Sequence, residues 1–93
     1  MPPIKKTPKD SLTILTDTVL PGETNAINNL FGGELLARMD RAAAISAKRH
    51  SKQFVVTSSV NNVSFGMPIP LGSTVTIEAK VSRAFNSSME VYI

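Results

Sequence analysis

The 93-residue chain has no cysteine, no tryptophan and a single histidine. Without cysteine it can form neither a disulfide nor a cysteine metal site, which fits a reducing compartment. No cluster of histidines and carboxylates has metal-ligand spacing either. Aromatic residues make up only 5% of the chain, whereas surfaces that stack nucleic-acid bases depend on exposed aromatic rings. We therefore expect no metal and no nucleic-acid ligand.

Long hydrophobic runs are also absent. No apolar stretch approaches the roughly 18 residues that a membrane-spanning helix needs, and no hydrophobic signal-peptide core follows the N-terminus. The chain combines 42% hydrophobic with 18% charged residues, a balance typical of a globular domain. These features predict one soluble cytoplasmic domain without membrane contact, whose thin core would benefit from a partner subunit.

The net charge is +3, and much of the excess lies in the opening segment MPPIKKTPKD. We expect residues 1–10 to form a flexible basic tail and residues 11–93 to form the domain. A mild positive field suits an anionic ligand such as a phosphorylated small molecule. A small nucleic-acid-binding protein is an alternative that would rest on this charge alone.

The remaining sequence predicts an α+β fold with one long helix against an antiparallel sheet. Residues 11–20 and 53–65 are rich in β-branched residues and predict strands. Residues 33–50 carry helix-forming residues with helical periodicity. Residues 74–82 alternate apolar and polar side chains, as a strand with one buried face does. Residues 89–93 begin a further strand, at whose fifth residue the sequence ends.

An aspartate interrupts the apolar stripe of the predicted helix. Leu36, Met39, Ala43 and Ala47 fall on one side at about 100° per residue, and Asp40 lies within the same arc. The charged residues of the opposite side are Glu34, Arg38, Arg41, Lys48 and Arg49. A carboxylate on a buried face is costly unless it is paired, solvated or kept for chemistry. Periodicity alone leaves a structural ion pair and a catalytic role equally open.

Two glycines, Gly32 and Gly33, stand at the beginning of this helix. Glycine lets a ligand approach the free backbone N–H groups, where the helix dipole favours negative charge, although a simple tight turn is the alternative. Gly33 precedes Asp40 by two helical turns, about 10.5 Å along the axis. A group polarised at the helix start is therefore far from Asp40, unless the substrate spans both or Asp40 works with another subunit.

The stretch TNAINNLFGGELLARMDRAAAISAKRH, followed by VVTSSVNNVSFGMPIPLGSTVTIEAKV, resembles the hot dog fold acyl-CoA thioester hydrolases. Within them it is most similar to the YciA-like branch, related to the cytosolic acyl-CoA hydrolases of animals. Val63, Phe65, Pro68 and Gly72 fit a downstream family pattern. The resemblance runs from about residue 16 to the last residue. It implies a central helix wrapped by a curved antiparallel sheet, in a domain that lacks its C-terminal strand or strands here.

The resemblance also implies a reaction and its residues. The reaction is hydrolysis of acyl-CoA to a carboxylic acid and CoA, without a cofactor, at the interface of a homodimer that sometimes assembles into a trimer of dimers. Asp40 matches the catalytic acid, as general base or nucleophile, and Asn29 matches a polar position opposite it across the interface. The residues assigned to the oxyanion and substrate are Gly32, Gly33, Asn25 and Phe31. Arg83 is the candidate for the CoA phosphates.

Other functions fit less well. A non-catalytic acyl-CoA-binding or sensing module on the same fold is the main alternative, and an acidic residue at position 40 favours the enzyme. His50 stands at the end of the predicted helix, where it suits a helix cap better than a Ser-His-Asp triad. No phosphate-binding P-loop occurs. The preferred acyl chain length stays open.

Overall fold

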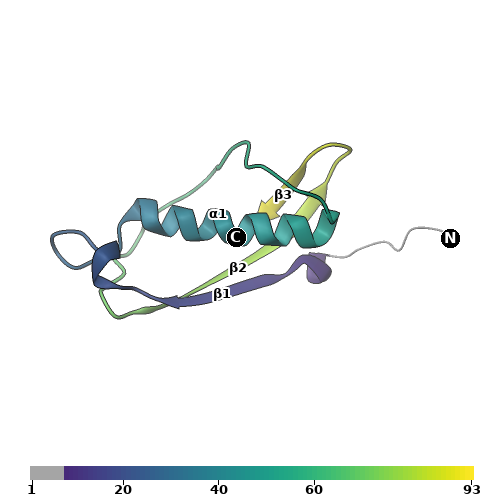
Figure 1. Ribbon diagram of the computed structural model, residues 1–93. Helices are drawn as coiled ribbons and strands as arrows, with labels where there is room; N and C mark the ends of the chain where they lie inside the picture. The colour runs from purple at the N-terminus through teal and green to yellow at the C-terminus, as the bar shows by residue number, and fades with distance from the viewer. Residues whose placement is uncertain (1–7) are drawn as a thin grey trace.

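The computed structural model describes residues 8–93 and contains one long helix against a three-stranded antiparallel sheet (Figure 1). The elements in chain order are the 3-10 helix η1 (Pro8–Ser11), strand β1 (Thr13–Thr18), 3-10 helix η2 (Pro21–Glu23), helix α1 (Gly32–Ser51), strand β2 (Thr74–Ala84) and strand β3 (Met89–Tyr92). The predicted α+β fold with one long helix is confirmed.

The sheet has the order β1-β2-β3, with both neighbouring pairs antiparallel. β2 shows the predicted alternation, because Ile77, Ala79 and Val81 are buried while Glu78 and Lys80 are exposed. Its buried face packs on α1. The core consists of Ala42, Ile77 and Ala79, with Leu15, Leu35, Met39, Val75 and Val91 packed against it.

Helix α1 extends one residue beyond the prediction at each end. It begins after Phe31, whose backbone is extended and whose side chain forms no capping hydrogen bond. It ends at Ser51. The following cap residue, Lys52, adopts the left-handed conformation with φ of 61° and donates its N–H to the Lys48 carbonyl. Lys48, Arg49 and His50 lie in the last turn, where positive charge complements the helix dipole.

The predicted strand over residues 53–65 is wrong. This segment takes no part in the described sheet. It runs back over α1 towards the beginning of the helix, on the side away from β1 (Figure 1). Both edges of β2 are taken by β1 and β3, and the segment pairs with the outer edge of neither β1 nor β3. Because a strand needs a neighbour to receive its ladder of hydrogen bonds, this β-prone segment stays extended, with Phe54 and Val56 more than nine-tenths exposed.

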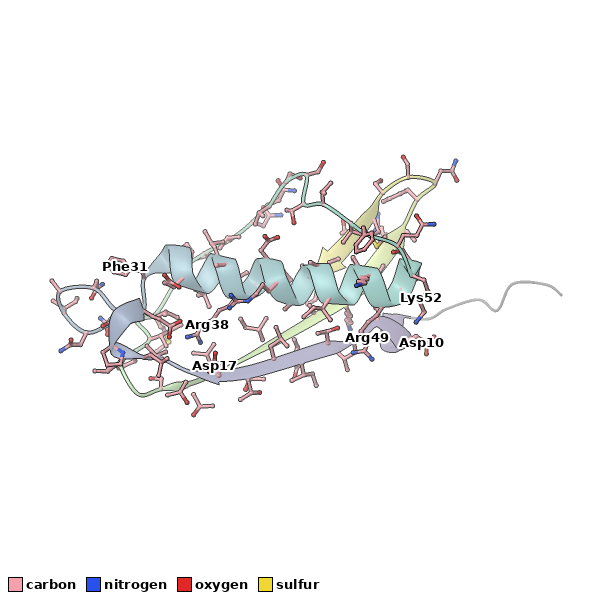
Figure 2. All side chains as sticks on the ribbon, in the orientation of Figure 1. Asp10, Asp17, Phe31, Arg38, Arg49 and Lys52 are labelled. Carbon is pink, nitrogen blue, oxygen red and sulfur yellow. The ribbon has the colours of Figure 1, made fainter. Side chains whose placement is uncertain are left out.

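The buried face of α1 also differs from the prediction. Arg38, expected on the outer side, is only 4% exposed, whereas Asp40 lies on the surface. Ser46 is fully buried and donates its hydroxyl to the Ser11 carbonyl at 2.8 Å. Figure 2 places Arg38 and Arg49 between α1 and β1. Apolar periodicity could not identify this buried face of α1, because the face carries polar side chains. These side chains form hydrogen bonds with partners far away in the sequence.

The N-terminal part of the described chain is tied to the sheet. Residues 8–10, expected in the tail, belong to η1. Ser11 at its end is fully buried, and its hydroxyl accepts the Val81 N–H at 2.8 Å. Arg49 donates to the Leu12 carbonyl at 2.8 Å. The rest of the predicted tail, residues 1–7, lies outside the described residues.

Candidate active site

The beginning of α1 presents free backbone donors. The first N–H groups of any helix lack partners within the helix, and here Phe31 supplies no side-chain cap. The first hydrogen bond of the helical i to i−4 type is the one from the Leu35 N–H to the Phe31 carbonyl at 3.1 Å. The N–H groups of Gly32 and Gly33 are thus in the position where a helix receives an anion or a polarised oxygen.

The loop before the helix is shaped by Asn25. Its Oδ1 accepts the backbone N–H of Ile27 at 3.0 Å and that of Asn29 at 3.1 Å. Its own N–H donates to the Asn29 carbonyl at 2.8 Å. Asn28 in the middle of the loop has φ of 60°, a conformation that asparagine tolerates better than most residues. Because the loop occupies Oδ1, the Asn25 side-chain NH₂ is the group that it can offer to a ligand.

A cavity of about 470 Å³ opens at this end of the helix. Its lining residues are Asn25, Asn29, Leu30, Gly32, Leu35, Ser64, Phe65, Gly66, Met67, Pro68 and Ile69. The loop is held against residues 69–71 by backbone hydrogen bonds from Leu30 to Ile69 and from Leu71 to Asn28. The structure therefore brings three predicted site residues together, namely Asn25, Asn29 and Gly32.

The other predicted site residues lie outside this cavity. Gly33 is exposed beside Gly32, and Phe31 is 51% exposed at the beginning of α1 (Figure 2). Arg83 is exposed near the end of β2, where the register with β3 shifts. Asp40 is exposed midway along α1. One chain therefore holds the predicted catalytic carboxylate and the predicted oxyanion donors apart.

Asp40 has a partner that the sequence reasoning missed. The Thr57 hydroxyl donates to Asp40 Oδ1 at 2.5 Å. Thr57 belongs to the extended segment 53–65, so the contact joins this segment to the middle of α1. The sequence does show hydroxyl residues within the β-branched run QFVVTSSV. Only the path of the chain, however, shows which of these hydroxyls reaches the Asp40 carboxylate.

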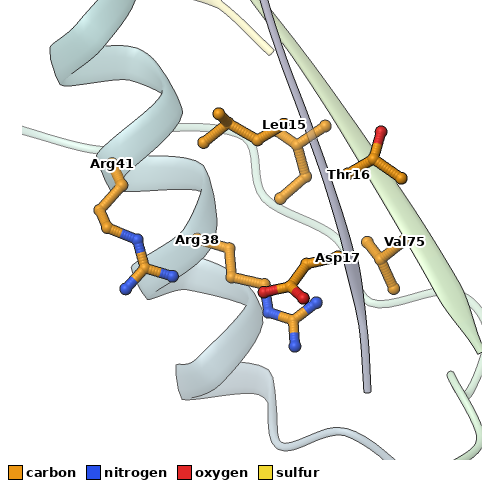
Figure 3. Close-up of a pocket in the computed structure, with 7 residues that line it drawn as sticks. Leu15, Thr16, Asp17, Arg38, Arg41 and Val75 are labelled. Atoms are coloured by element: carbon orange, nitrogen blue, oxygen red, sulfur yellow. The ribbon is translucent and has the colours of Figure 1, made fainter. Parts of the chain in front are cut away.

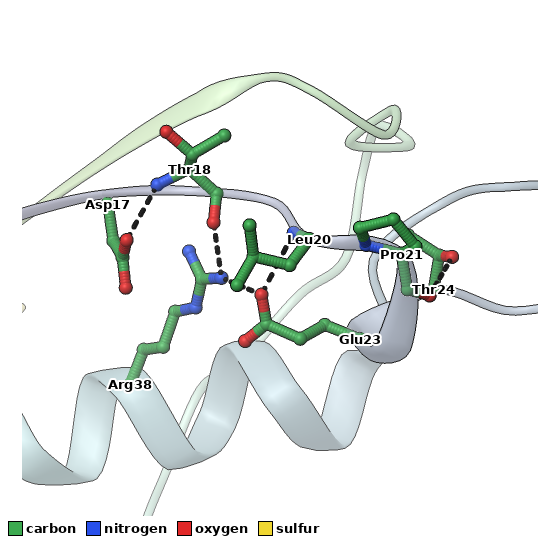
Figure 4. Close-up of polar contacts among 7 residues, drawn as sticks. All are labelled: Asp17, Thr18, Leu20, Pro21, Glu23, Thr24 and Arg38. Carbon is green, nitrogen blue, oxygen red and sulfur yellow. Dashed lines mark hydrogen bonds and ion pairs between the residues drawn. The ribbon is translucent and has the colours of Figure 1, made fainter.

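An ion pair anchors the loop to the helix. Arg38 Nη2 lies 2.9 Å from Glu23 Oε1 and donates to the Thr18 carbonyl at 3.2 Å (Figure 4). The Leu20 N–H donates to the same Glu23 oxygen at 3.0 Å. The hydrogen bond from Leu20, followed by the one from Arg38, lowers the pKa of Glu23 below its ordinary value. These contacts connect β1, η2 and α1 just before the site.

A second hollow, of about 340 Å³, lies between the N-terminal half of α1 and the sheet (Figure 3). It is lined by Leu15, Thr16, Asp17, Arg38, Arg41, Val75 and Ile77, and Asp17 and Arg38 point towards one another in it. The Nε and Nη1 atoms of Arg38 have no hydrogen-bond partner. None of the predicted site residues lines this hollow, so it is separate from the candidate site.

Within residues 8–93, no three His, Cys, Asp or Glu side chains come together as a metal site would require. No helix in this described range has the length and apolar character to cross a membrane.

Residues 27–93 match the sequence profile of the thioesterase superfamily. The chain belongs to this superfamily. It is 41% identical over 85 residues to a Bacillus subtilis protein named as the uncharacterized acyl-CoA thioester hydrolase YkhA, covering 91% of this chain and 49% of that protein. It is 46% identical over 79 residues to mouse acyl-coenzyme A thioesterase 11, covering 85% of this chain and 13% of that protein.

Solved structures similar to this chain are also acyl-CoA hydrolases. An acyl-CoA hydrolase from Staphylococcus aureus, in complex with butyryl-CoA, CoA and CoA disulfide, superposes with a TM-score of 0.89 at 41% identity. The match covers 92% of this chain and 52% of that one. The predicted hot dog fold is confirmed. This chain spans about half the length of the Bacillus protein and of the Staphylococcus structure.

Three structures of the Staphylococcus enzyme carry single alanine substitutions, at an asparagine, an aspartate and a threonine. The asparagine precedes the aspartate by 15 residues, and the threonine follows it by 17. Asn25 and Thr57 stand at the same two spacings from Asp40 in this chain. Two of these three residues, Asp40 and Thr57, are hydrogen-bonded to one another here.

Proposed function

We propose that this chain carries the catalytic elements of an acyl-CoA thioester hydrolase. The observation that carries the proposal is the uncapped N-terminus of α1, which opens onto a cavity lined by Asn25 and Asn29. The reaction is hydrolysis of an acyl-CoA to a carboxylic acid and free CoA. It needs no cofactor, since CoA is part of the substrate.

The helix start stabilises the charge that develops during the reaction. Attack on the thioester carbonyl places negative charge on its oxygen, and preorganised N–H donors stabilise such an oxyanion. The N–H groups of Gly32 and Gly33 are the proposed donors, because the helix leaves them unpaired and adds the positive end of its dipole. The Asn25 side-chain amide supplies a further donor to the carbonyl or the water.

Asp40 is the proposed catalytic carboxylate. It either takes a proton from the attacking water as general base or attacks the carbonyl carbon itself. Thr57 acts as a positioning residue, because its hydroxyl engages Oδ1 and fixes the direction of Oδ2. The shared spacing with the Staphylococcus enzyme supports Asn25, Asp40 and Thr57 as one catalytic set. It favours Asn25 over Asn29 as the catalytic asparagine.

The distance along α1 supports a site shared between two copies of the chain. Gly32 and Asp40 are separated by about 12 Å of helix axis, at 1.5 Å per residue. We propose a homodimer in which Asp40 of one subunit meets the helix start of the other. The exposed segment 53–65, which pairs with no described strand, offers a surface for such an interface. Neighbouring structures include a hexameric acyl-CoA thioesterase, which supports further assembly into a trimer of dimers. Arg83 remains the proposed contact for CoA phosphates.

The test is release of CoA thiol from a panel of acyl-CoAs, comparing the parent chain with Asp40→Asn. This change keeps the shape of the side chain and removes its charge. We expect a fall in kcat of at least about a hundredfold, as loss of a general base commonly causes. The matched control is Asp17→Asn, which neutralises another exposed aspartate outside the site. Asp40→Asn activity equal to that of the control would remove Asp40 from the mechanism.

The alternative is a module that binds acyl-CoA without hydrolysing it. It predicts saturable binding of acyl-CoA by the parent chain with no release of thiol. Measuring binding and turnover on the same preparation therefore separates the two functions.

A further inference from the structure

The cavity at the beginning of α1 has walls of two different kinds. Asn25, Asn29 and Ser64 supply polar groups to its lining. The rest of the lining is mainly apolar, with side chains from Leu30, Leu35, Phe65, Met67, Pro68 and Ile69. A pantetheine arm carries two amides, which lose free energy when they are buried without hydrogen-bond partners. An acyl chain has no such groups. The apolar wall therefore suits the acyl part of the substrate better than the CoA part.

Phe65 occupies a particular place in this wall. Three atoms of its ring lie 3.5–3.8 Å from the point where a Cβ on Gly32 would stand, so the ring covers the first residue of the helix. In the proposed function, the Gly32 N–H polarises the thioester carbonyl. The ring is then the apolar group beside the Gly32 backbone, within reach of a substituent on the carbon next to that carbonyl. Phe65 is the last residue of segment 53–65 and lies far from Gly32 in the sequence.

We propose that this cavity receives the acyl group and that Phe65 selects against branching at the carbon next to the carbonyl. The inference rests on the proposed thioesterase function and adds its substrate class, namely acyl groups that are unbranched at that carbon. Met67, at 83% exposure, stands at the open side of the cavity and sets no comparable limit on the far end of the chain.

The experiment compares butyryl-CoA with isobutyryl-CoA, two isomers that differ only in branching at that carbon. The ratio of their kcat/KM values is measured for the parent, Phe65→Leu and Phe65→Ala. We expect the parent to prefer the straight isomer. Phe65→Ala should reduce this preference about tenfold or more, the usual effect of one methyl group in an apolar pocket. Phe65→Leu should fall in between.

The control is Phe85→Ala, which removes a ring that is 62% exposed, lies outside segment 53–65 and does not line the cavity. It should leave the isomer ratio unchanged. An equal loss on both substrates in Phe65→Ala would overturn the inference while leaving the thioesterase function intact, as would a parent that hydrolyses both isomers equally well. A parent that hydrolyses neither, nor any other acyl-CoA, would overturn both. If Phe65→Ala fails to fold by circular dichroism, the ratio for Phe65→Leu decides.

Discussion

At the scale of single residues, the Asp40 carboxylate has one hydroxyl, that of Thr57, as its hydrogen-bond partner. Asp40 lies on the exposed side of α1, where water solvates its charge, so no buried ion pair is needed to hold it. Thr57 engages one carboxylate oxygen. In the proposed reaction, the other oxygen faces the water or the carbonyl carbon. The hydrogen bond thus joins the charged Asp40 on helix α1 with Thr57 on the following segment 53–65, and Thr57 orients the carboxylate.

Replacing Thr57 with valine should test this role, because the change keeps the branched shape and removes only the hydroxyl. We expect kcat to fall about ten- to a hundredfold, the equivalent of about 1.5–3 kcal/mol for a hydrogen bond to a charged group, with little change in KM. Thr57→Ser should retain most of the activity. Steady-state kinetics on one acyl-CoA supply the readout. A valine variant with parental kcat would show that Asp40 needs no orienting partner.

At the scale of elements, the site depends on how α1 is joined to the chain before it. The loop that carries Asn25 leaves η2 and enters the helix within a few residues. Arg38 reaches from the second turn of α1 to Glu23 and to the end of β1. A buried guanidinium requires such partners. This link should therefore hold the loop at a fixed position relative to the helix start.

The link should make stability depend on pH. Because folding lowers the pKa of Glu23 below its ordinary value of 4.5, its contribution is fully present above that value and is lost as the pH falls through the lowered pKa. We expect the parent's Tm to decrease in this acidic range. Glu23→Gln should have a lower Tm at neutral pH and a smaller decrease on acidification. Thermal unfolding followed by circular dichroism between pH 7 and 3 measures both.

Glu34→Gln is the matched control, since Glu34 is an exposed carboxyl in the first turn of α1 and is not part of the ion pair with Arg38. It should preserve the parent's dependence on pH. Parallel curves for the parent and Glu23→Gln would contradict the proposed contribution of the ion pair.

At the scale of the whole molecule, catalysis is proposed to need two subunits. Each chain holds Asp40 and Thr57 at one place and the helix start with Asn25 at another. In a two-fold symmetric dimer, each of the two sites would take one part from either chain. The exposed segment 53–65, which finds no strand to pair with among the described residues, is the natural region for contact between the subunits.

Mixing two inactive variants tests this arrangement. Asp40→Asn and Asn25→Ala should each have little activity alone. In a mixed dimer, one site combines both defects and the other combines two intact parts. Random exchange of equal amounts should therefore restore about a quarter of the parent's activity, as symmetry requires for shared sites. CoA release is measured before and after subunit exchange. No recovery, despite mixed dimers detected by mass spectrometry, would place the whole site within one chain.

The sequence by itself determined the elements whose signals are local. The helical period and the alanine-rich composition defined α1 to within one residue at each end, and alternation defined the buried face of β2. The glycine pair marked the helix start. That the first N–H groups there lack partners follows from helix geometry alone. Periodicity drew attention to Asp40. The resemblance to acyl-CoA hydrolases supplied the hot dog fold that the comparisons confirm, and it gave Asp40 its expected catalytic role.

Only the tertiary structure decided which distant residues meet. Segment 53–65 has the composition of a strand, yet its path runs over α1 and not along an edge of the sheet, which composition cannot report. Arg38 could be buried only because Glu23 and the end of β1 lie beside it. The contacts of Thr57 with Asp40 and of Phe65 with Gly32 join residues 17 and 33 positions apart. Such contacts depend on the path of the chain in space, which local periodicity and propensity leave undetermined.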